Sequence, residues 1–95
     1  MTSEELKRGY KLDGIVLFHS TQCKVCEKEK QLLEAVIKKF SEVECDDDPD
    51  YFISNFDIDV LPEIRIYENG NVVWKKTDFI SEQDLQFLKD YIGVI

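Results

Sequence analysis

Apolar positions along the chain fall into stretches with two different spacings. Residues 14–18 form a run without a polar or charged side chain, which predicts a short buried strand. Between residues 32 and 40, apolar side chains recur mostly three or four positions apart, which predicts an amphipathic helix. A strand-to-helix junction is therefore expected in the segment that connects the two stretches.

The rest of the chain predicts further short strands and helices, separated by turn residues. They are strands at 43–45, 63–68 and 71–76, and helices at 2–10, 51–56 and 81–91. The last two strands are joined by Asn69-Gly70, a dipeptide that favours a tight hairpin and hence antiparallel pairing. Asp48 and Pro49 suit the N-cap and the first position of the helix that follows them.

These elements together predict an α/β domain built on a mixed sheet. The strands near residues 15–19 and 42–46 are joined through a helix, so they should be parallel, with a right-handed crossover. The hairpin adds two antiparallel strands to them. With 95 residues, the chain fits a single domain over 1–95.

Charge and composition bear on the partners and the location of the protein. A formal net charge of −8 at pH 7 disfavours binding to nucleic acid or to an anionic membrane surface, because both would repel the chain. No run of about 18 apolar residues occurs, so no membrane span is expected. Residues 1–5 lack the basic and apolar regions of a signal peptide. We therefore expect a cytoplasmic protein, in a compartment that keeps thiols reduced.

Cys23 and Cys26 form a C-x-x-C pair at the strand-to-helix junction. Side chains three positions apart share one helix face, with Cβ atoms about 5–6 Å apart, so a small local adjustment allows a disulfide. The unpaired N–H groups and the dipole of a helix N-terminus favour a thiolate on Cys23, and the thiolate is the form that attacks disulfides. Cys23 is therefore the expected nucleophile, and Cys26, one turn into the helix, is the expected resolving thiol.

Two other roles for the pair compete with redox chemistry. The cysteines could be buried structural residues, or they could be half of a zinc site, which needs about four ligands. The remaining candidates, Cys45 and His19, are not part of a second paired motif, and we expect no metal site. Cys45 alternates with Val43 on a short strand and is expected to be a small buried residue.

The order of these features resembles the thioredoxin-like family from about residue 14 to the end of the chain. A C-x-x-C pair follows a strand, Pro62 begins another strand later in the chain, and Asn69-Gly70 closes a hairpin. The resemblance implies a reduced version of the thioredoxin-like fold, with a central four-stranded mixed sheet flanked by helices. It also implies a monomeric thiol–disulfide oxidoreductase without a bound cofactor, which acts on protein or peptide disulfides. A reductase or a thiol reductant would then restore the dithiol.

The resemblance also assigns residues to substrate binding. In this family the matching proline is cis and lies beside the cysteine pair, and the residue before it pairs with the substrate backbone, which points to Leu61 and Pro62. Gln22, Glu63 and Asp78 stand where thioredoxins have a tryptophan, a threonine and, close by, a glycine. We expect these three side chains to line an acidic groove, which would favour segments carrying Lys or Arg over anionic glutathione.

Two further residues could tune the reactive thiol. Lys24, between the cysteines, could stabilise a Cys23 thiolate, and His19 could tune it or shuttle a proton. Each has a plainer alternative, because Lys24 could be a solvated surface lysine and His19 an ordinary strand-end residue. Leu17 stands where thioredoxins keep a buried aspartate that assists proton transfer from the resolving cysteine.

Two other functions compete with a thioredoxin-like one. Glutaredoxins commonly hold glutathione with Thr-Val before the proline and a glycine pair before the last helix, whereas this chain has Val60-Leu61 and Glu82-Gln83. A glutathione-dependent reductase is therefore the second choice. The third is a binding adaptor that keeps the fold while its cysteines are redox-idle. Redox cycling of Cys23 and Cys26 would separate the adaptor from both reductases.

Overall fold

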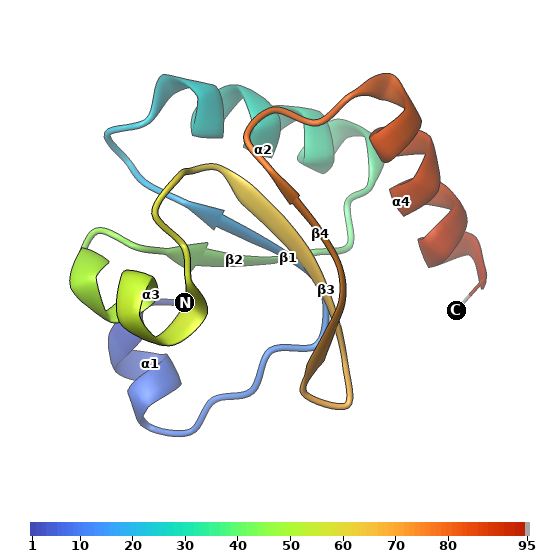
Figure 1. Cartoon of the computed structure of the whole chain (residues 1–95). Coiled ribbons are helices and arrows are strands. Elements are labelled where there is room, and N and C mark those ends of the chain that lie inside the picture. The colour runs from blue at the N-terminus through green and yellow to red at the C-terminus, as the bar shows by residue number, and fades with distance from the viewer. Residues whose placement is uncertain (95) are drawn as a thin grey trace.

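The computed structural model describes residues 1–94, which form four helices and four strands (Figure 1). In chain order these are α1 (Ser3–Lys7), β1 (Gly14–His19), α2 (Lys24–Val36), β2 (Ser41–Glu44), α3 (Pro49–Phe56), β3 (Glu63–Glu68), β4 (Asn71–Thr77) and α4 (Glu82–Val94). This order of elements is the one predicted from the hydrophobic spacing, with boundaries shifted by a few residues.

The strands form one mixed sheet in the order β2-β1-β3-β4. β1 and β2 are parallel, with Phe18 opposite Val43, and α2 connects them. β3 runs antiparallel to β1, with Ile64 opposite Leu17, and antiparallel to β4 across the Asn69-Gly70 turn. The predicted α/β fold, a four-stranded mixed sheet flanked by helices, is confirmed.

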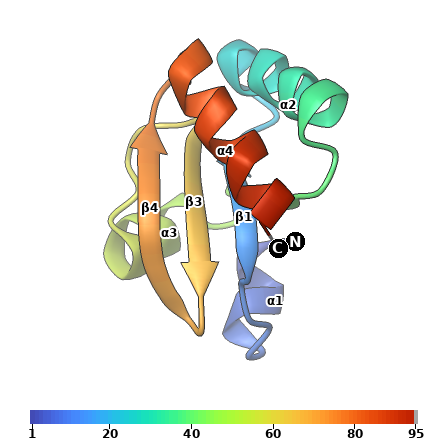
Figure 2. The same ribbon diagram turned by 90° about the vertical axis from the view of Figure 1, so that its right-hand side faces the viewer.

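Helices cover both faces of the sheet, with α1 and α3 on one face and α2 and α4 on the other (Figure 1 and Figure 2). Successive side chains of a strand point to opposite faces, so each face has its own core. The core under α1 and α3 contains Leu12, Val16, Phe18, Val43, Cys45, Phe52, Ile58 and Tyr67. The core under α2 and α4 contains Ile15, Leu17, Leu33, Ile37, Ile64, Ile66, Ile80 and Leu88. β1 contributes to both cores and therefore lies at the centre of the molecule.

Two helices end earlier than the sequence predicts. α1 stops at Lys7, because Gly9 adopts a left-handed conformation with a φ of 98° and the chain turns away. α2 stops at Val36, and Lys38 has a φ of 65° in the connection that follows. Phe40 packs against the core from this connection. The apolar spacing continues past the end of α2 because the connection also faces the core.

Three consecutive aspartates after β2 hold three different parts of the fold, and we call residues 46–48 the aspartate run. Asp46 accepts hydrogen bonds from the turn before α2. Asp47 accepts from the N–H and the hydroxyl of Ser3, at 3.2 and 2.5 Å, and so fixes the start of α1. Asp48 is the predicted N-cap of α3 and accepts an N–H of its first turn at 3.2 Å. The aspartate run is therefore a structural junction.

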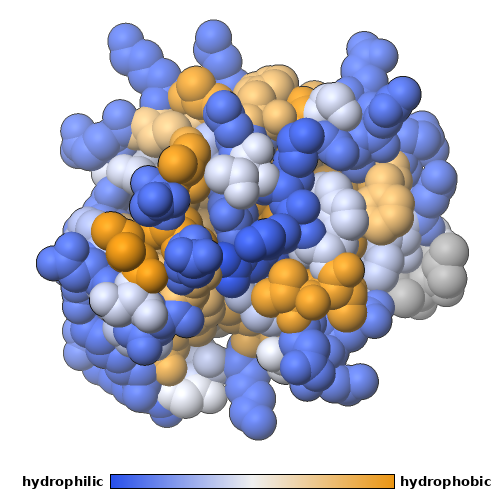
Figure 3. Space-filling view, viewed as in Figure 1, coloured by the Kyte–Doolittle hydropathy of each residue, from blue (hydrophilic) through white to orange (hydrophobic). Residues whose placement is uncertain are grey.

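Hydrophobic side chains on the face seen in Figure 1 are dispersed, and Figure 3 shows them as separate patches among charged and polar residues. The exposed large hydrophobic residues of the molecule include Val25, Ile53, Val60, Val73, Phe79 and Phe87. None of the helices within residues 1–94 is long and apolar enough to cross a membrane.

Candidate active site

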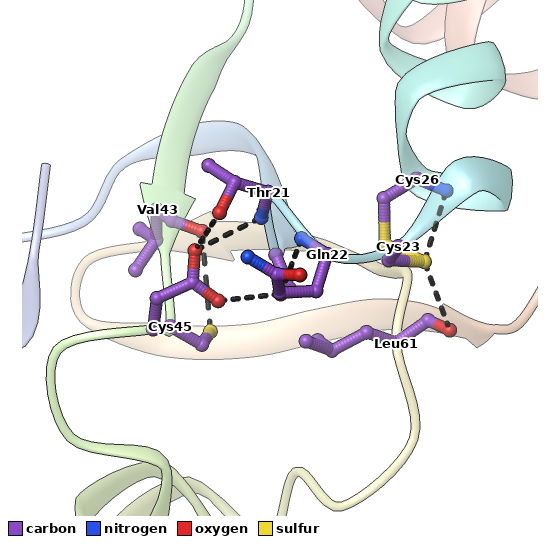
Figure 4. The surroundings of a disulfide bond; sticks show 9 residues. Thr21, Gln22, Cys23, Cys26, Val43, Cys45 and Leu61 are labelled. Carbon is purple, nitrogen blue, oxygen red and sulfur yellow. Dashed lines mark hydrogen bonds between the residues drawn. A yellow bond between two sulfur atoms is a disulfide. The ribbon is translucent and has the colours of Figure 1, made fainter.

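The C-x-x-C pair lies where β1 gives way to α2 (Figure 4). Cys23 is the N-cap of α2, with an extended backbone at φ −107° and ψ 110°. Its Sγ accepts the N–H of Cys26 at 3.1 Å, which is one of the N–H groups that a helix leaves unpaired at its start. The Cys23 sulfur thus lies at the predicted helix N-terminus, where the helix dipole favours negative charge.

The two cysteines are joined by a disulfide and differ in accessibility. Their Cα atoms are 5.2 Å apart, within the usual range for a disulfide. Cys26 is only 1% exposed, whereas Cys23 is partly exposed. When the pair is reduced, burial above all, with the hydrogen bond to Cys23 and the charge of Glu29, raises the pKa of the Cys26 thiol to about 12. Cys23 is therefore the more accessible of the two sulfurs, and the reduced Cys26 thiol is a weaker acid than an ordinary cysteine.

Asp46 stabilises the turn before Cys23 through hydrogen bonds. Its carboxylate accepts the hydroxyl protons of Ser20 and Thr21 and, at 2.9 Å, the N–H of Thr21. Ser20 in turn accepts the N–H of Cys23 at 3.2 Å and the N–H of Gln22 at 3.1 Å. The hydrogen bond from Ser20, with those from Thr21, lowers the pKa of Asp46. Sequence reasoning missed this role, although the parallel pairing of β1 and β2 brings the ends of the two strands side by side.

The segment before β3 lies next to Cys23. The Leu61–Pro62 peptide bond is cis, and the carbonyl oxygen of Leu61 is 4.0 Å from the Cys23 Sγ (Figure 4). Pro62 is fully buried, and its carbonyl accepts the N–H of Asp78 at 2.7 Å. Leu61 is partly exposed, so it is the residue of this pair that offers surface beside the sulfur.

Glu63 does not line a groove, and the prediction that it contacts substrate is wrong. The residue is 3% exposed, and its carboxylate accepts from Arg65 Nε and, at 3.0 Å, from the hydroxyl of Thr77. Arg65 also donates to the Tyr67 hydroxyl at 3.2 Å and to the carbonyl of Phe56. The alternation of side chains along a strand explains why Glu63 is buried. Glu63 shares a face of β3 with Arg65, and its carboxylate balances the charge of that buried guanidinium.

The other two predicted groove residues, Gln22 and Asp78, are exposed. Gln22 lies in the turn immediately before Cys23 (Figure 4). Asp78 has a φ of 69°, a left-handed conformation that glycine adopts freely and aspartate tolerates. Its N–H bond to Pro62 holds it beside the segment before β3. The structure therefore brings Gln22 to Cys23 and Asp78 to Pro62.

The two predicted tuning residues lie in different surroundings. His19 lines a cleft of about 310 Å³ that also contains Lys30 and both cysteines. Its Nε2 is 3.4 Å from the carboxylate of Glu42, which also pairs with Lys30 at 3.0 Å. Burial lowers the pKa of His19 and so disfavours its charged form. Lys24, by contrast, is exposed at the first position of α2.

The third cysteine is a core residue. Cys45 follows β2, is 4% exposed and is not in a disulfide. Burial, with the charges of Asp46 and Asp47, raises the pKa of its thiol to about 12. The prediction of a small buried residue is confirmed. Within residues 1–94, no group of three or more His, Cys, Asp and Glu side chains is placed to hold a metal ion.

A buried carboxylate lies close to the pair, and sequence reasoning missed it. Glu29 is on α2, one turn beyond Cys26, and is 0% exposed. Its Oε1 accepts the N–H of Ile80 at 2.7 Å, whereas its Oε2 has no hydrogen-bond partner within residues 1–94. Burial, with the negative charges of Asp78 and Asp84, raises the pKa of Glu29 to about 7. Its position three residues after Cys26, on the same helix face, is a sequence signal that could have identified it.

Comparison with known proteins finds similarity of structure. No protein-family model matches the chain, and no curated protein matches it in sequence. The thioredoxin f2 of Chlamydomonas reinhardtii matches with a TM-score of 0.67 and 17% identity, over 93% of this chain and 86% of that one. Fasciola hepatica thioredoxin matches with a TM-score of 0.67 and 19% identity, over 95% and 93%. Plasmodium falciparum thioredoxin matches with a TM-score of 0.64 and 17% identity, over 95% and 93%.

At these identities the likeness concerns the fold. Together with the C-x-x-C pair at the junction of β1 and α2, the fold supports thiol–disulfide oxidoreductase chemistry in general. By its sheet order, its flanking helices and its similarity to these solved structures, the chain is a thioredoxin-like protein in fold.

Proposed function

We propose that this protein is a thiol–disulfide oxidoreductase that cycles Cys23 and Cys26 between dithiol and disulfide. The observation that carries the proposal is the pairing of a partly exposed sulfur at a helix N-terminus with a buried sulfur one turn away. The helix N-terminus favours the attacking thiolate, and the buried partner is close enough to close an intramolecular disulfide.

The proposed reaction runs through a mixed disulfide. The Cys23 thiolate attacks one sulfur of a substrate disulfide, so that a bond from Cys23 to the substrate forms, the substrate S–S bond breaks, and one substrate thiolate leaves and takes up a proton. Cys26 then loses its proton and attacks the Cys23 sulfur. The Cys23–Cys26 bond forms and the second substrate thiol is released. An external thiol or a reductase must supply the electrons and protons that restore the dithiol.

We propose a protein or peptide as the substrate. Leu61 presents its backbone beside Cys23, where an extended segment could add as a strand. Gln22 and Asp78 are exposed near this edge, and the net charge of −8 opposes anionic ligands such as glutathione. Substrate segments with Lys or Arg near the disulfide should therefore associate faster at low salt.

The proposed electron exchange takes place between sulfur atoms of this chain and of its substrate, so it needs no bound cofactor. We further propose that the protein acts as a monomer in a compartment that keeps thiols reduced, such as the cytoplasm. A reductase or a small thiol could there restore the dithiol after each turnover.

The test is turnover of a peptide disulfide by the wild-type protein and three cysteine variants. Cys23→Ser should abolish reduction, because it removes the nucleophile. Cys26→Ser should stop the reaction at the mixed disulfide with Cys23, which intact-mass spectrometry detects. Cys45→Ala is the matched control and should keep wild-type turnover, since Cys45 belongs to the core under α1 and α3.

Other outcomes would favour the competing functions. A Cys23–Cys26 pair that keeps one redox state in both reducing and oxidising buffers would favour a redox-idle adaptor. Faster turnover with a glutathione mixed disulfide than with any peptide would place the protein with the glutaredoxins. Alkylation of the reduced protein gives an independent check on the assignment of roles, because Cys26 and Cys45 are buried and Cys23 should react first.

A further inference from the structure

The second half of the proposed reaction needs a proton acceptor for Cys26. Burial raises the pKa of this thiol, so only a small fraction of molecules carries a Cys26 thiolate at neutral pH. The thiolate is the form that attacks the mixed disulfide. A base beside the thiol would remove this obstacle by taking the proton during the attack.

We propose that Glu29 accepts the proton of Cys26 when Cys26 attacks the mixed disulfide. This inference rests on the proposed oxidoreductase function. The two residues are three positions apart on α2, so their side chains share one helix face, with Cβ atoms about 5–6 Å apart. Their exposed fractions are 0% for Glu29 and 1% for Cys26, so bulk water competes little for the proton.

The carboxylate of Glu29 is held at one oxygen and free at the other. Oε1 accepts the N–H of Ile80 at 2.7 Å, from the loop between β4 and α4. Oε2 is buried and has no hydrogen-bond partner among residues 1–94. A buried polar atom without a partner is costly and uncommon in native proteins, and a catalytic role is one of the reasons for keeping it. The free oxygen is the one that would receive the proton.

The charges around Glu29 suit a base that works near neutral pH. The groups that interact electrostatically with Glu29 are Cys26 on α2, Asp78 in the loop after β4 and Asp84 on α4, and Asp84 pairs with Lys76 at 3.4 Å. Burial, together with the negative charges of Asp78 and Asp84, raises the pKa of Glu29 to about 7. A general base is most effective when its pKa lies near the working pH.

The proposed step conserves atoms and electrons. Oε2 of Glu29 takes the proton from the Cys26 Sγ, and the resulting thiolate attacks the Cys23 Sγ. The Cys23–Cys26 bond forms while the bond from Cys23 to the substrate sulfur breaks, and the electron pair of that bond leaves with the substrate thiolate. The substrate thiolate takes a proton from solvent, and Glu29 later releases its own proton to solvent.

The experiment separates the two thiol steps with a symmetrical aromatic disulfide whose thiol product is coloured. After rapid mixing with reduced protein, attack by Cys23 releases the first coloured thiol and attack by Cys26 releases the second. Both phases are followed from about pH 5 to about pH 9 for the wild type, Glu29→Gln and Glu34→Gln. Glu29→Gln keeps an oxygen that can accept the Ile80 N–H. Glu34, an exposed carboxylate on the same helix, is the matched control.

For Glu29→Gln we expect the second phase to slow about 100-fold at pH 7, with the first phase unchanged. The wild-type second phase should rise with pH through about 7 and then level off, because Glu29 ionises there. The second phase of the variant should instead keep rising toward the pKa of Cys26 itself. Both phases of Glu34→Gln should match those of the wild type.

If Glu29 had only an electrostatic or structural role, the Glu29→Gln substitution would not slow the second phase. The negative charge of Glu29 raises the pKa of Cys26, so removing it would leave the second phase unchanged or faster at neutral pH, and that result overturns the proposal. If the variant does not fold, the wild-type profile decides. A wild-type second phase that keeps rising about tenfold per pH unit above neutral pH also overturns it. A wild type without any second phase would instead refute the oxidoreductase function.

Discussion

Asp46 fixes the turn before Cys23 through one carboxylate. Oδ1 accepts the hydroxyl of Ser20, and Oδ2 accepts both the N–H of Thr21 at 2.9 Å and its hydroxyl at 2.6 Å. Because the carboxylate is charged, these bonds are stronger than neutral ones, although partial exposure weakens them. The position of the Cys23 sulfur therefore depends on a residue that follows the neighbouring strand.

Asp46→Asn should lower the free energy of unfolding at neutral pH by about 1 kcal/mol, because an amide nitrogen replaces one accepting oxygen. The pKa of Asp46 is lowered in the folded protein, so its contribution is present above the usual aspartate pKa and is lost as the pH falls through the folded value. The difference should therefore vanish in strong acid. Denaturant unfolding measures it, with exposed Asp59→Asn as the control, and an equal loss in both variants would contradict this role.

Among the elements, the loop between β4 and α4 supports the surroundings of both cysteines. The N–H of Asp78 bonds the carbonyl of Pro62 at 2.7 Å, and the N–H of Ile80 bonds Glu29 at 2.7 Å. One short loop thus holds the segment before β3 and the buried face of α2. It couples the proposed substrate edge to the proposed proton acceptor without containing a cysteine.

Asp78→Gly should keep the fold and change substrate choice. Glycine adopts the left-handed conformation without a Cβ penalty, and the bond to Pro62 uses the backbone N–H. Loss of the negative charge should reduce the preference for basic over acidic peptide disulfides at low salt, measured as a ratio of kcat/KM values. Asp90→Asn removes an exposed charge on α4 and is the control. An unchanged ratio in Asp78→Gly would show that Asp78 does not face the substrate.

For the molecule as a whole, some ionisable groups increase the free energy of unfolding as the pH rises, and others decrease it. Hydrogen bonds lower the pKa values of Asp46 and Asp48, so their contributions appear as the pH rises through the acid range. Burial of Glu29 acts the other way. Its folded pKa is raised from 4.5 to about 7, so its contribution is complete below the lower value and is lost as the pH rises through the higher one. Maximal stability is therefore expected in mildly acidic solution.

The free energy of unfolding of the oxidised protein should fall by up to about 3 kcal/mol between about pH 5 and about pH 8, and Glu29→Gln should remove most of this fall. His19 acts with the opposite sign below its usual pKa, because burial lowers the pKa and folding disfavours its charged form. His19 is present in both proteins, so the difference between their stability curves isolates Glu29. Parallel curves for the two proteins would contradict the raised pKa.

Local patterns predict the elements and the redox pair, whereas the residues that support the pair depend on tertiary contacts. The hairpin at Asn69-Gly70 and the junction at the cysteines follow from neighbours in sequence. The sequence predicts a groove position for Glu63 because it follows the proline, but strand alternation and the buried Arg65 turn it inward. Asp46 and Glu29 bond residues of other elements, and no local pattern specifies those partners.

The aspartate run limits where the chain can change length. Each of its side chains serves a different element, so an insertion within residues 46–48 would disconnect the turn before α2, the start of α1 or the start of α3. The Asn69-Gly70 turn lies at the opposite end of the sheet from the cysteines. One glycine inserted after Asp46 should lower the thermal midpoint more than one inserted after Gly70, as a melting curve of each variant would show. Both loops lie at the surface, so position at the surface alone does not make a loop permissive to insertion.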